Sequence, residues 1–359
     1  MSFFLEKLFN VTVHRRWGLG EKTFDPSGIR RILVVRTDNV GDVLCCTPAI
    51  RALRKAFSGS YLAALVVKYS QDALAGNPDL DEIFMYERPR HRPDRSRMAL
   101  LLEKLRLTQT LRNLGFDLAI GLRSSFSWSE AWLVYATGAP LRLGYAPEEG
   151  RPQKFGFFYN WRVTPVPDVH EVKRVLHLIQ TLGVQPGEDH LAVSISREEN
   201  ETAESFLRER AIDRQKLIGF HLSSRVPANR WGLQNFAELA IRLIREDGKF
   251  VVLTWGPGDE GQAQEVRERV GRGIFLFPTS TFKKLGAIQQ CCRAFVSPDG
   301  GAMHFSTAVG TPTVGLFGTT NPHHWAPWGN GHAALRKGKQ VDLISVDEVY
   351  HALKIRMKS

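Results

Sequence analysis

Short apolar runs alternate with amphipathic segments along most of the chain. In the first half, residues 32–35, 62–67 and 116–120 have the length and composition of buried strands. Residues 98–114 and 171–182 repeat their apolar positions with helical spacing. Strands that alternate with helices in this way predict a parallel sheet covered by helices on both faces.

The same alternation restarts after a polar stretch at residues 194–205. Four further strands are expected, at 217–220, 250–253, 294–296 and 313–317, with helices between them. Two such runs predict an α/β protein with two doubly wound, Rossmann-like domains. The expected divisions of the chain are, in order, an N-terminal extension at 1–30, a first domain at 31–190, a second domain at 191–340, and a C-terminal helix within 341–359 that packs back toward the N-terminal domain.

Polar and glycine-rich clusters follow the predicted strands. Sheets of this class bind ligands beyond the carboxyl ends of their strands, and with two domains the natural site is the cleft between them. The clusters found after strands are residues 36–42, 221–231, 254–260, 297–304 and 318–322. Each of them therefore falls where this architecture puts its site.

The first cluster, within RTDNVGDVLCCTPAI at residues 36–50, holds two carboxylates. Asp38 and Asp42 lie in a turn that contains Gly41. Their residue types alone fit three roles, namely helix capping, a metal or phosphate site, or the acid–base chemistry of an enzyme.

The fourth cluster consists of Asp299, two glycines and the start of a helix. Glycine allows the backbone to approach a ligand closely, and first-turn N–H groups favour an anion such as a diphosphate. The side chains that could hold the same phosphates from the other side are Ser223 and Ser224 with Arg225 or Arg230. The structural alternative is that Asp299 only caps the helix and His304 only packs within it.

Several enzyme classes lose support because their motifs are missing. The chain has no P-loop ending, no GxGxxG fingerprint and no GxSxG elbow, which disfavours P-loop nucleotide hydrolases, common NAD dehydrogenases and serine hydrolases. No cluster has metal-ligand spacing, since His323 and His324 are adjacent and their side chains diverge on most backbones. No metal site is therefore expected.

Composition and charge narrow the class of protein further. The 43% hydrophobic and 24% charged residues are typical of a soluble globular protein, and no apolar run reaches the ~18–20 residues that span a bilayer. The N-terminal segment is a poor secretory signal, so a cytoplasmic location is expected. The formal charge of +11 includes a basic segment at residues 88–112, which could be a solvated face or could meet nucleic acid, an anionic membrane or a phosphorylated substrate. Nucleic acid is disfavoured because no recognised motif accompanies the charge.

Two segments carry a specific resemblance. ILVVRTDNVGDVLCCTPAIRALRKAF and VSPDGGAMHFSTAVGTPTVGLFGTTNPHHWAPWG resemble the two hallmark segments of glycosyltransferase family 9, the ADP-heptose:lipopolysaccharide heptosyltransferases. Intervening pieces, including IGFHLSSRVPANRWGLQNFAELA, match in the same order over about residues 30–335. The resemblance implies the GT-B fold, two facing Rossmann-like domains with the active site in the cleft, and it implies no metal or cofactor.

The family then implies roles for the acceptor side. Asp42 matches the proposed catalytic base, which takes the proton of the acceptor hydroxyl as that oxygen attacks the anomeric carbon with inversion. Asp38, Gly41 and Arg123 match supporting positions, and Asp38 is expected to orient the acceptor or to modulate Asp42. The implied acceptor is the anionic lipid A–core glycolipid, with the basic segment facing it and with peripheral attachment to the inner-leaflet membrane surface. Nucleic acid is not an implied partner.

The second domain is implied to bind the nucleotide sugar, a substrate rather than a cofactor. The matching residues are Ser223, Ser224, Arg225, Arg230, Asp259, Glu260, Asp299, Gly300, Gly301, Ala302, Met303 and His304. Two positions depart from the family pattern: Asn229 stands where a lysine is usual, and Gly300 where a hydroxyl residue is common. The departures keep open a second hypothesis, a non-catalytic or differently specific sugar-nucleotide-binding protein, or one that modifies another glycan or a protein.

The N-terminal extension has its own alternatives. Phe3, Phe4, Leu5, Leu8 and Phe9 lie near basic side chains and could form an interfacial helix. A docking arm or a partly disordered tail is the other interpretation.

Overall fold

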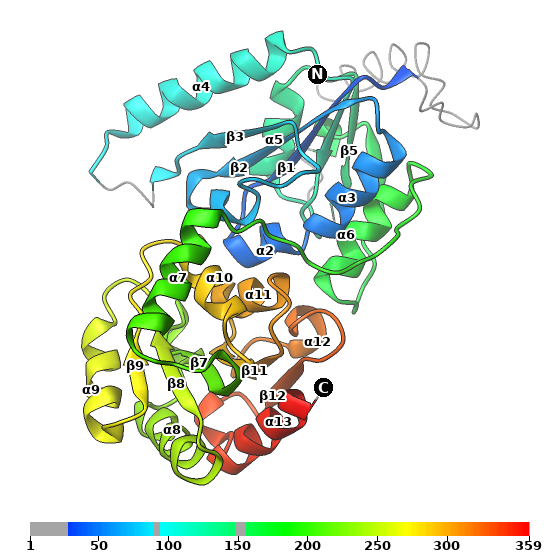
Figure 1. The fold of residues 1–359 in the computed structure, drawn as a ribbon. Helices are drawn as coiled ribbons and strands as arrows, with labels where there is room; N and C mark the ends of the chain where they lie inside the picture. The colour runs from blue at the N-terminus through cyan, green and yellow to red at the C-terminus, as the bar shows by residue number, and fades with distance from the viewer. Residues whose placement is uncertain (1–27, 90–93, 148–155, 359) are drawn as a thin grey trace. The chain divides into compact units, whose positions relative to one another are not determined.

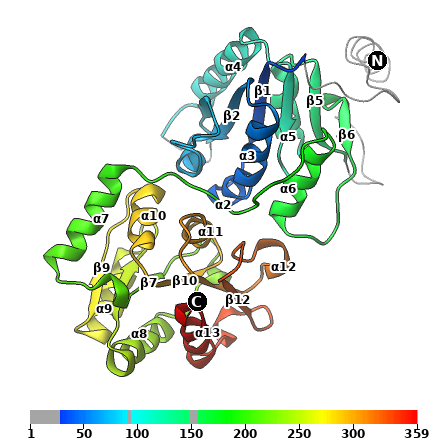
Figure 2. The ribbon, with the colours of Figure 1, turned by 45° about the vertical axis from the view of Figure 1, so that its right-hand side comes forward.

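The computed structural model describes residues 28–89, 94–147 and 156–358. The chain divides into two compact units, Met1–Asp189 and His190–Ser359. Within the described residues, each unit is built on a six-stranded sheet in which every pair of neighbouring strands is parallel (Figures 1 and 2). The possible interfacial helix at residues 3–9 lies outside the described residues.

The first unit orders its strands β3-β2-β1-β4-β5-β6. These strands are β1 Arg31–Arg36, β2 Tyr61–Val67, β3 Glu82–Tyr86, β4 Leu118–Gly121, β5 Leu141–Tyr145 and β6 Trp161–Val163. The helices are α2 Val40–Leu44, α3 Thr47–Ala56, α4 Arg97–Asn113, α5 Trp128–Ala136 and α6 Glu171–Gln180, with 3₁₀ turns at Lys68–Ala73 and Gly156–Phe158. Helices α4 and α5 cover one face of this sheet, and α3 and α6 pack together on the other (Figure 1).

The second unit orders its strands β12-β11-β10-β7-β8-β9. These strands are β7 Leu217–His221, β8 Phe250–Thr254, β9 Ile274–Leu276, β10 Ala294–Pro298, β11 Thr313–Phe317 and β12 Ala333–Arg336. The helices are α7 Arg197–Glu209, α8 Leu233–Asp247, α9 Glu260–Val270, α10 Phe282–Gln290, α11 Gly301–Ala308, α12 Pro322–Trp325 and α13 Val346–Lys358, with 3₁₀ turns at Arg214–Lys216, Pro227–Asn229 and Val341–Leu343. Helices α8, α9 and α13 pack on one face, and α7, α10 and α11 on the other.

Both sheets have the same strand order. Counted in chain order within each unit, the strands lie 3-2-1-4-5-6, and the order reverses between the first and fourth strands. Such switch points are where open α/β sheets bind ligands, because the loops leaving two adjacent strands diverge there. The points are β1 with β4 in the first unit and β7 with β10 in the second. The predicted α/β class with parallel sheets is confirmed.

Helix α13 packs against its own unit. The C-terminal helix was expected to pack back toward the N-terminal domain. Its buried side chains Val349 and Leu353 join the apolar cluster formed with α8 and the second sheet. That packing uses its apolar face inside the second unit, and the expected approach to the N-terminal domain stays a prediction.

Tyr159 occupies space that two glycines leave open in the first sheet. Its side chain is 3% exposed, and its ring lies against Gly121 of β4 and Gly144 of β5. A Cβ atom at either glycine would overlap the tyrosine ring. Each strand therefore has a glycine where a side chain would overlap the ring, so the ring can pack closely against the backbone.

Candidate active site

The turn after β1 holds Asp42 between two fixed groups. Asn39 caps the short helix α2, and both its backbone N–H and its side-chain amide donate to Asp42 Oδ2 at 3.1 Å. The other carboxylate oxygen, Oδ1, accepts from Arg36 at 3.0 Å. Gly41 is buried within α2, and the Asp42 side chain remains 17% exposed. The carboxylate is thus oriented by its own turn and still reachable.

Arg36, the last residue of β1, organises the acidic groups around it. Its side chain is 3% exposed and forms ion pairs with Asp38 at 3.1 Å, with Asp42 at 3.0 Å and with Glu171 at 2.8 Å. It also donates to the carbonyl of Leu122 at 2.6 Å. Burial would lower the pKa of Arg36, but the surrounding negative charges, Glu171 first, raise it well above its usual value. A fixed positive charge therefore lies beneath both aspartates.

The loop after β4 brings the predicted Arg123 to the same place. Arg123 Nη1 lies 2.6 Å from Asp38 Oδ1, so Asp38 bridges two guanidinium groups. From another direction, Arg88 donates to the hydroxyl of Thr37 at 3.0 Å. The first switch point thus collects the four residues predicted for the acceptor side: Asp38, Gly41, Asp42 and Arg123.

Sequence reasoning missed several members of this cluster. Arg36 ends an apolar strand with a charged residue, and that position was the one available signal. Glu171 starts α6, 135 residues further along, and is fully buried. Arg88 belongs to the basic segment, and nothing in the sequence around Glu130 of α5 indicates that this carboxyl group is buried. Nothing in their spacing indicates that these residues meet.

Glu130 lies beneath the Arg123 loop and is fully buried. Its Oε1 accepts from the backbone N–H of Arg123 at 3.1 Å. Burial, helped by the negative charge of Asp38, raises the pKa of Glu130 from 4.5 to about 7. A carboxyl group that changes charge near neutral pH therefore lies directly beneath the Arg123 loop.

Substituting Glu130 by glutamine is expected to flatten the pH dependence of stability. Because its pKa is higher in the folded chain, Glu130 contributes stability that is complete below about pH 4.5 and is lost as the pH rises through about 7. The whole effect is roughly 3 kcal/mol. Urea unfolding at pH 5 and pH 8 measures it: wild type should lose more stability between the two than Glu130→Gln, and equal losses would contradict the prediction.

In the second unit, the turns after β7, β8 and β10 are bonded to one another. Ser223 Oγ accepts from Gly256 N–H at 2.8 Å, and Ser224 Oγ donates to the carbonyl of Asp299 at 3.1 Å. Arg230 donates to the carbonyl of Ser224 at 2.8 Å and forms an ion pair with Asp259 at 3.0 Å. The predicted residues of the second switch point thus form one connected group.

Two other predicted residues, Arg225 and Glu260, lie next to this group. Arg225 is in the turn after β7, Glu260 follows the turn after β8, and both side chains are exposed. Beneath the turns, burial lowers the pKa of His221 to about 4, and its ring lies 3.0 Å from the hydroxyl of Thr254. The imidazole beneath these turns is therefore neutral at pH 7.

Asn229, one of the two departures from the family pattern, is fully buried. Its amide nitrogen donates to Asp299 at 3.2 Å and to Thr320 at 3.1 Å. Its amide oxygen accepts from Thr319 N–H at 3.1 Å. The side chain therefore joins the turns after β7, β10 and β11, a neutral hydrogen-bonding role that a lysine could not fill.

Helix α11 starts at the end of β10 with Gly300 as its cap. Its first intrahelical bond runs from His304 N–H to Gly300 at 3.4 Å, so the N–H groups before it precede the helical ladder. The side chains of Ala302, Met303 and His304 are buried, and the His304 ring meets Trp325 edge to face. What this segment can offer a ligand is thus its backbone at Gly300, Gly301 and the first turn.

The arrangement offers two kinds of chemistry. A reachable, oriented carboxylate suits proton transfer. A glycine-capped helix start, in the same hydrogen-bonded group as Arg230, suits an anionic group. Among residues 28–89, 94–147 and 156–358, no three His, Cys, Asp or Glu side chains are grouped as metal ligands would be.

Comparison with known proteins gives a consistent result. A family model described as glycosyltransferase family 9 (heptosyltransferase) matches residues 104–349. Lipopolysaccharide heptosyltransferase 3 of Escherichia coli (strain K12) is 24% identical over 300 residues, which cover 80% of this chain and 82% of that protein.

Solved structures share the architecture. A glycosyl transferase family 9 protein from Veillonella parvula superposes with a TM-score of 0.80 at 22% identity, covering 92% of this chain and 97% of its own. An E. coli heptosyltransferase solved with ADP has a TM-score of 0.76 at 20% identity, covering 91% and 99%. These likenesses confirm the predicted GT-B class of fold.

Proposed function

Because this chain belongs to glycosyltransferase family 9 and is therefore a glycosyltransferase, we propose that it transfers L-glycero-D-manno-heptose from ADP-heptose to a hydroxyl of the lipopolysaccharide inner core. The proposed acceptor sugar is Kdo or an earlier heptose, and the reaction is inverting and needs no metal. The proposed place of action is the inner face of the inner membrane. The names of the relatives support the donor and acceptor classes.

The observation that carries the proposal is the position of Asp42. It stands at the carboxyl end of β1, at a switch point, with its two oxygens oriented by Arg36 and Asn39. We assign it the role of base. The acceptor oxygen forms a bond to the anomeric carbon from the side opposite the diphosphate, its proton passes to Asp42, and the bond to ADP breaks with both electrons leaving on the diphosphate.

Asp38 has a supporting role in this scheme. It is less exposed than Asp42, at 11% against 17% for the side chain, and it bridges Arg36 and Arg123. It therefore holds Arg123 in position toward the acceptor. The family's usual lysine is replaced by the buried Asn229, so we assign charge stabilisation of the leaving diphosphate to the first-turn N–H groups of α11 and to Arg230.

A nucleotide panel tests the proposed donor. In thermal unfolding, ADP is expected to stabilise the chain more than UDP, GDP or dTDP at equal concentration. The stabilisation follows RT ln(1 + [L]/Kd), so a saturating ligand at about 100 times its Kd contributes about 2.7 kcal/mol. A greater shift with another nucleotide would overturn the assignment of ADP-heptose. Equal shifts with all four would point to phosphate binding without recognition of the base.

A further inference from the structure

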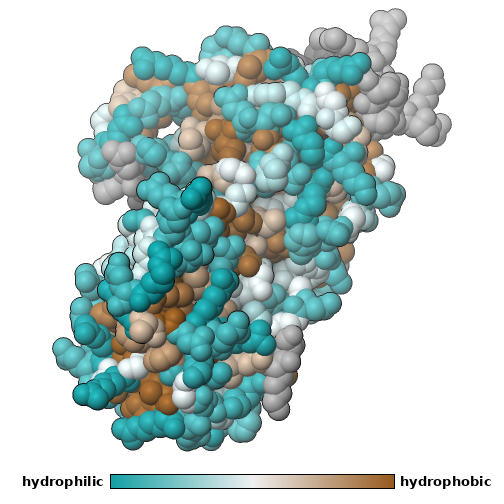
Figure 3. Space-filling model, in the orientation of Figure 1, coloured by the Kyte–Doolittle hydropathy of each residue, from teal (hydrophilic) through white to brown (hydrophobic). Residues whose placement is uncertain are grey.

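Helix α4 exposes a continuous apolar stripe. Met98, Leu101, Leu102 and Leu105 recur at helical spacing, so they lie on one face. They are 64%, 48%, 46% and 46% exposed. Figure 3 shows hydrophobic residues interrupting the polar surface along this helix. Single exposed apolar side chains are common, but four on one helical face are not explained by the fold.

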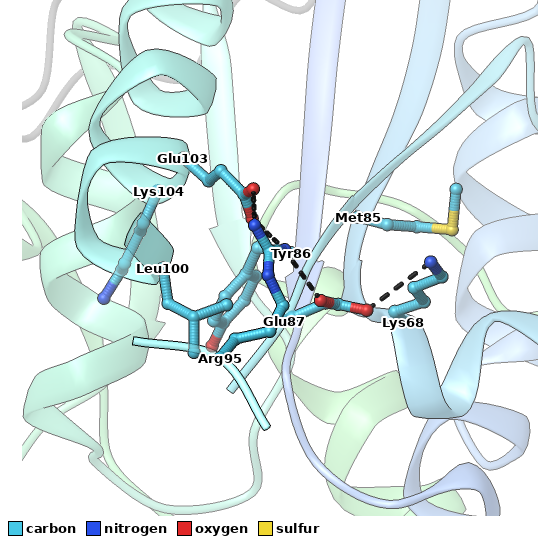
Figure 4. A pocket seen from close by; sticks show the side chains of 8 residues that line it. All are labelled: Lys68, Met85, Tyr86, Glu87, Arg95, Leu100, Glu103 and Lys104. Carbon is cyan, nitrogen blue, oxygen red and sulfur yellow. Dashed lines mark hydrogen bonds and ion pairs between the residues drawn. The ribbon is translucent and has the colours of Figure 1, made fainter. Parts of the chain in front are cut away.

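The opposite side of α4 is already occupied. Leu100 and Leu111 are buried, and Leu111 joins the core under the helix. The helix start is fixed by a ladder of ion pairs from Lys68 to Glu87, from Glu87 to Arg95 and from Arg95 to Glu103 (Figure 4). The pocket beside this ladder has a volume of about 300 Å³. The four residues of the stripe are therefore not among the apolar residues that attach α4 to its unit.

The charges on α4 complement an anionic surface. The helix carries four basic side chains, Arg97, Lys104, Arg106 and Arg112, against the single acid Glu103, a formal charge of +3. The one acid is paired with Arg95 on the ladder side. Arg97, Arg106 and Arg112 are exposed. An apolar stripe with cations and no acid beside it is the pattern of an interfacial helix.

We propose that the stripe of α4 binds an anionic lipid bilayer, with the four apolar side chains in the headgroup boundary and the arginines on lipid phosphates. This deepens and rests on the proposed function, because a membrane-anchored glycolipid acceptor must be met at the bilayer surface. A second copy of the chain is a poorer occupant, since a symmetric pairing would bring two such +3 helices together.

Vesicle flotation of the full chain tests the proposal. Wild type is expected to bind vesicles of phosphatidylglycerol and phosphatidylethanolamine. The double variant Leu101→Gln with Leu105→Gln should lose at least about tenfold in binding, because two side chains leave the apolar boundary. The matched control, Thr110→Gln with Asn113→Gln, changes exposed polar positions of the same helix and should bind as wild type does. Arg97→Gln with Arg106→Gln should weaken binding to these vesicles but not to pure phosphatidylcholine.

Three results would overturn the assignment of this surface. They are absence of binding by wild type, unchanged binding by the leucine variant, and a wild-type dimer in lipid-free solution that the leucine variant converts to monomer. Transfer to a water-soluble, deacylated acceptor separates the two proposals. The leucine variant should keep wild-type turnover on it. If neither wild type nor the leucine variant transfers sugar to this acceptor while vesicle binding still depends on the leucines, the proposed function is wrong. The assignment of the stripe as a lipid-binding surface is then kept.

Discussion

Replacing Asp42 by asparagine is expected to lower the rate of sugar transfer by about 10²–10⁴-fold. The amide keeps the size of the side chain but cannot accept the proton of the acceptor hydroxyl. Donor binding is assigned to the second unit, so the variant should bind ADP with the affinity of wild type. Turnover with ADP-heptose and calorimetric titration of ADP measure the two quantities separately.

Asp38→Asn is the matched control for that variant. It removes a carboxylate from the same turn but leaves Asp42 oriented by Asn39 and Arg36. We expect a smaller loss of turnover with a weaker apparent affinity for the acceptor, because Arg123 loses its anchor. Wild-type turnover by Asp42→Asn, or a larger loss in Asp38→Asn, would reverse the roles assigned to the two residues.

The second large effect is on stability. Arg36→Met is expected to lower the free energy of unfolding by about 3–5 kcal/mol, because it leaves buried carboxylate charge without its cationic partner. Glu171 is fully buried and pairs with Arg36 at 2.8 Å. The first unit should therefore unfold on the order of 10 °C earlier in a calorimetric scan.

A double substitution isolates the cause of that loss. Arg36→Met with Glu171→Gln removes both charges and should recover a substantial part of the lost stability, as a double-mutant cycle measures. Arg197→Met breaks a surface pair whose arginine is 92% exposed and should change stability by less than about 1 kcal/mol. If Arg36→Met is no worse than Arg197→Met, the buried network does not stabilise the fold.

The buried parallel strands could be predicted because their apolar runs are uninterrupted. Other elements could not be predicted from the sequence pattern, for identifiable reasons. Strand β5 carries Arg142 at its second position, and only the fold supplies the carbonyls of Phe158 and Ala139 that accept from its buried guanidinium at 2.8 Å. Helix α7 is mostly polar and buries few side chains, so its sequence looks like a linker although Ser196 and Glu199 form a capping box.

The site was predictable to the extent that it follows strand ends. Asp42 and Arg123 are far apart in the sequence, yet strand order alone places the ends of β1 and β4 together. Arg36 and Glu171 were not predictable in the same way, because their ion pair depends on where α6 packs. The role of Asn229 also required the structure, since its partners come from two other turns.

The packing of Tyr159 against two glycines has a consequence for how relatives of this chain diverge in sequence. Its ring fills the space over Gly121 and Gly144, so either glycine can gain a side chain only after the tyrosine has become smaller. The reverse order, loss of the ring first, would leave a cavity that costs stability. We therefore expect the three positions to change together in evolution, with glycines at 121 and 144 wherever an aromatic residue is kept at 159.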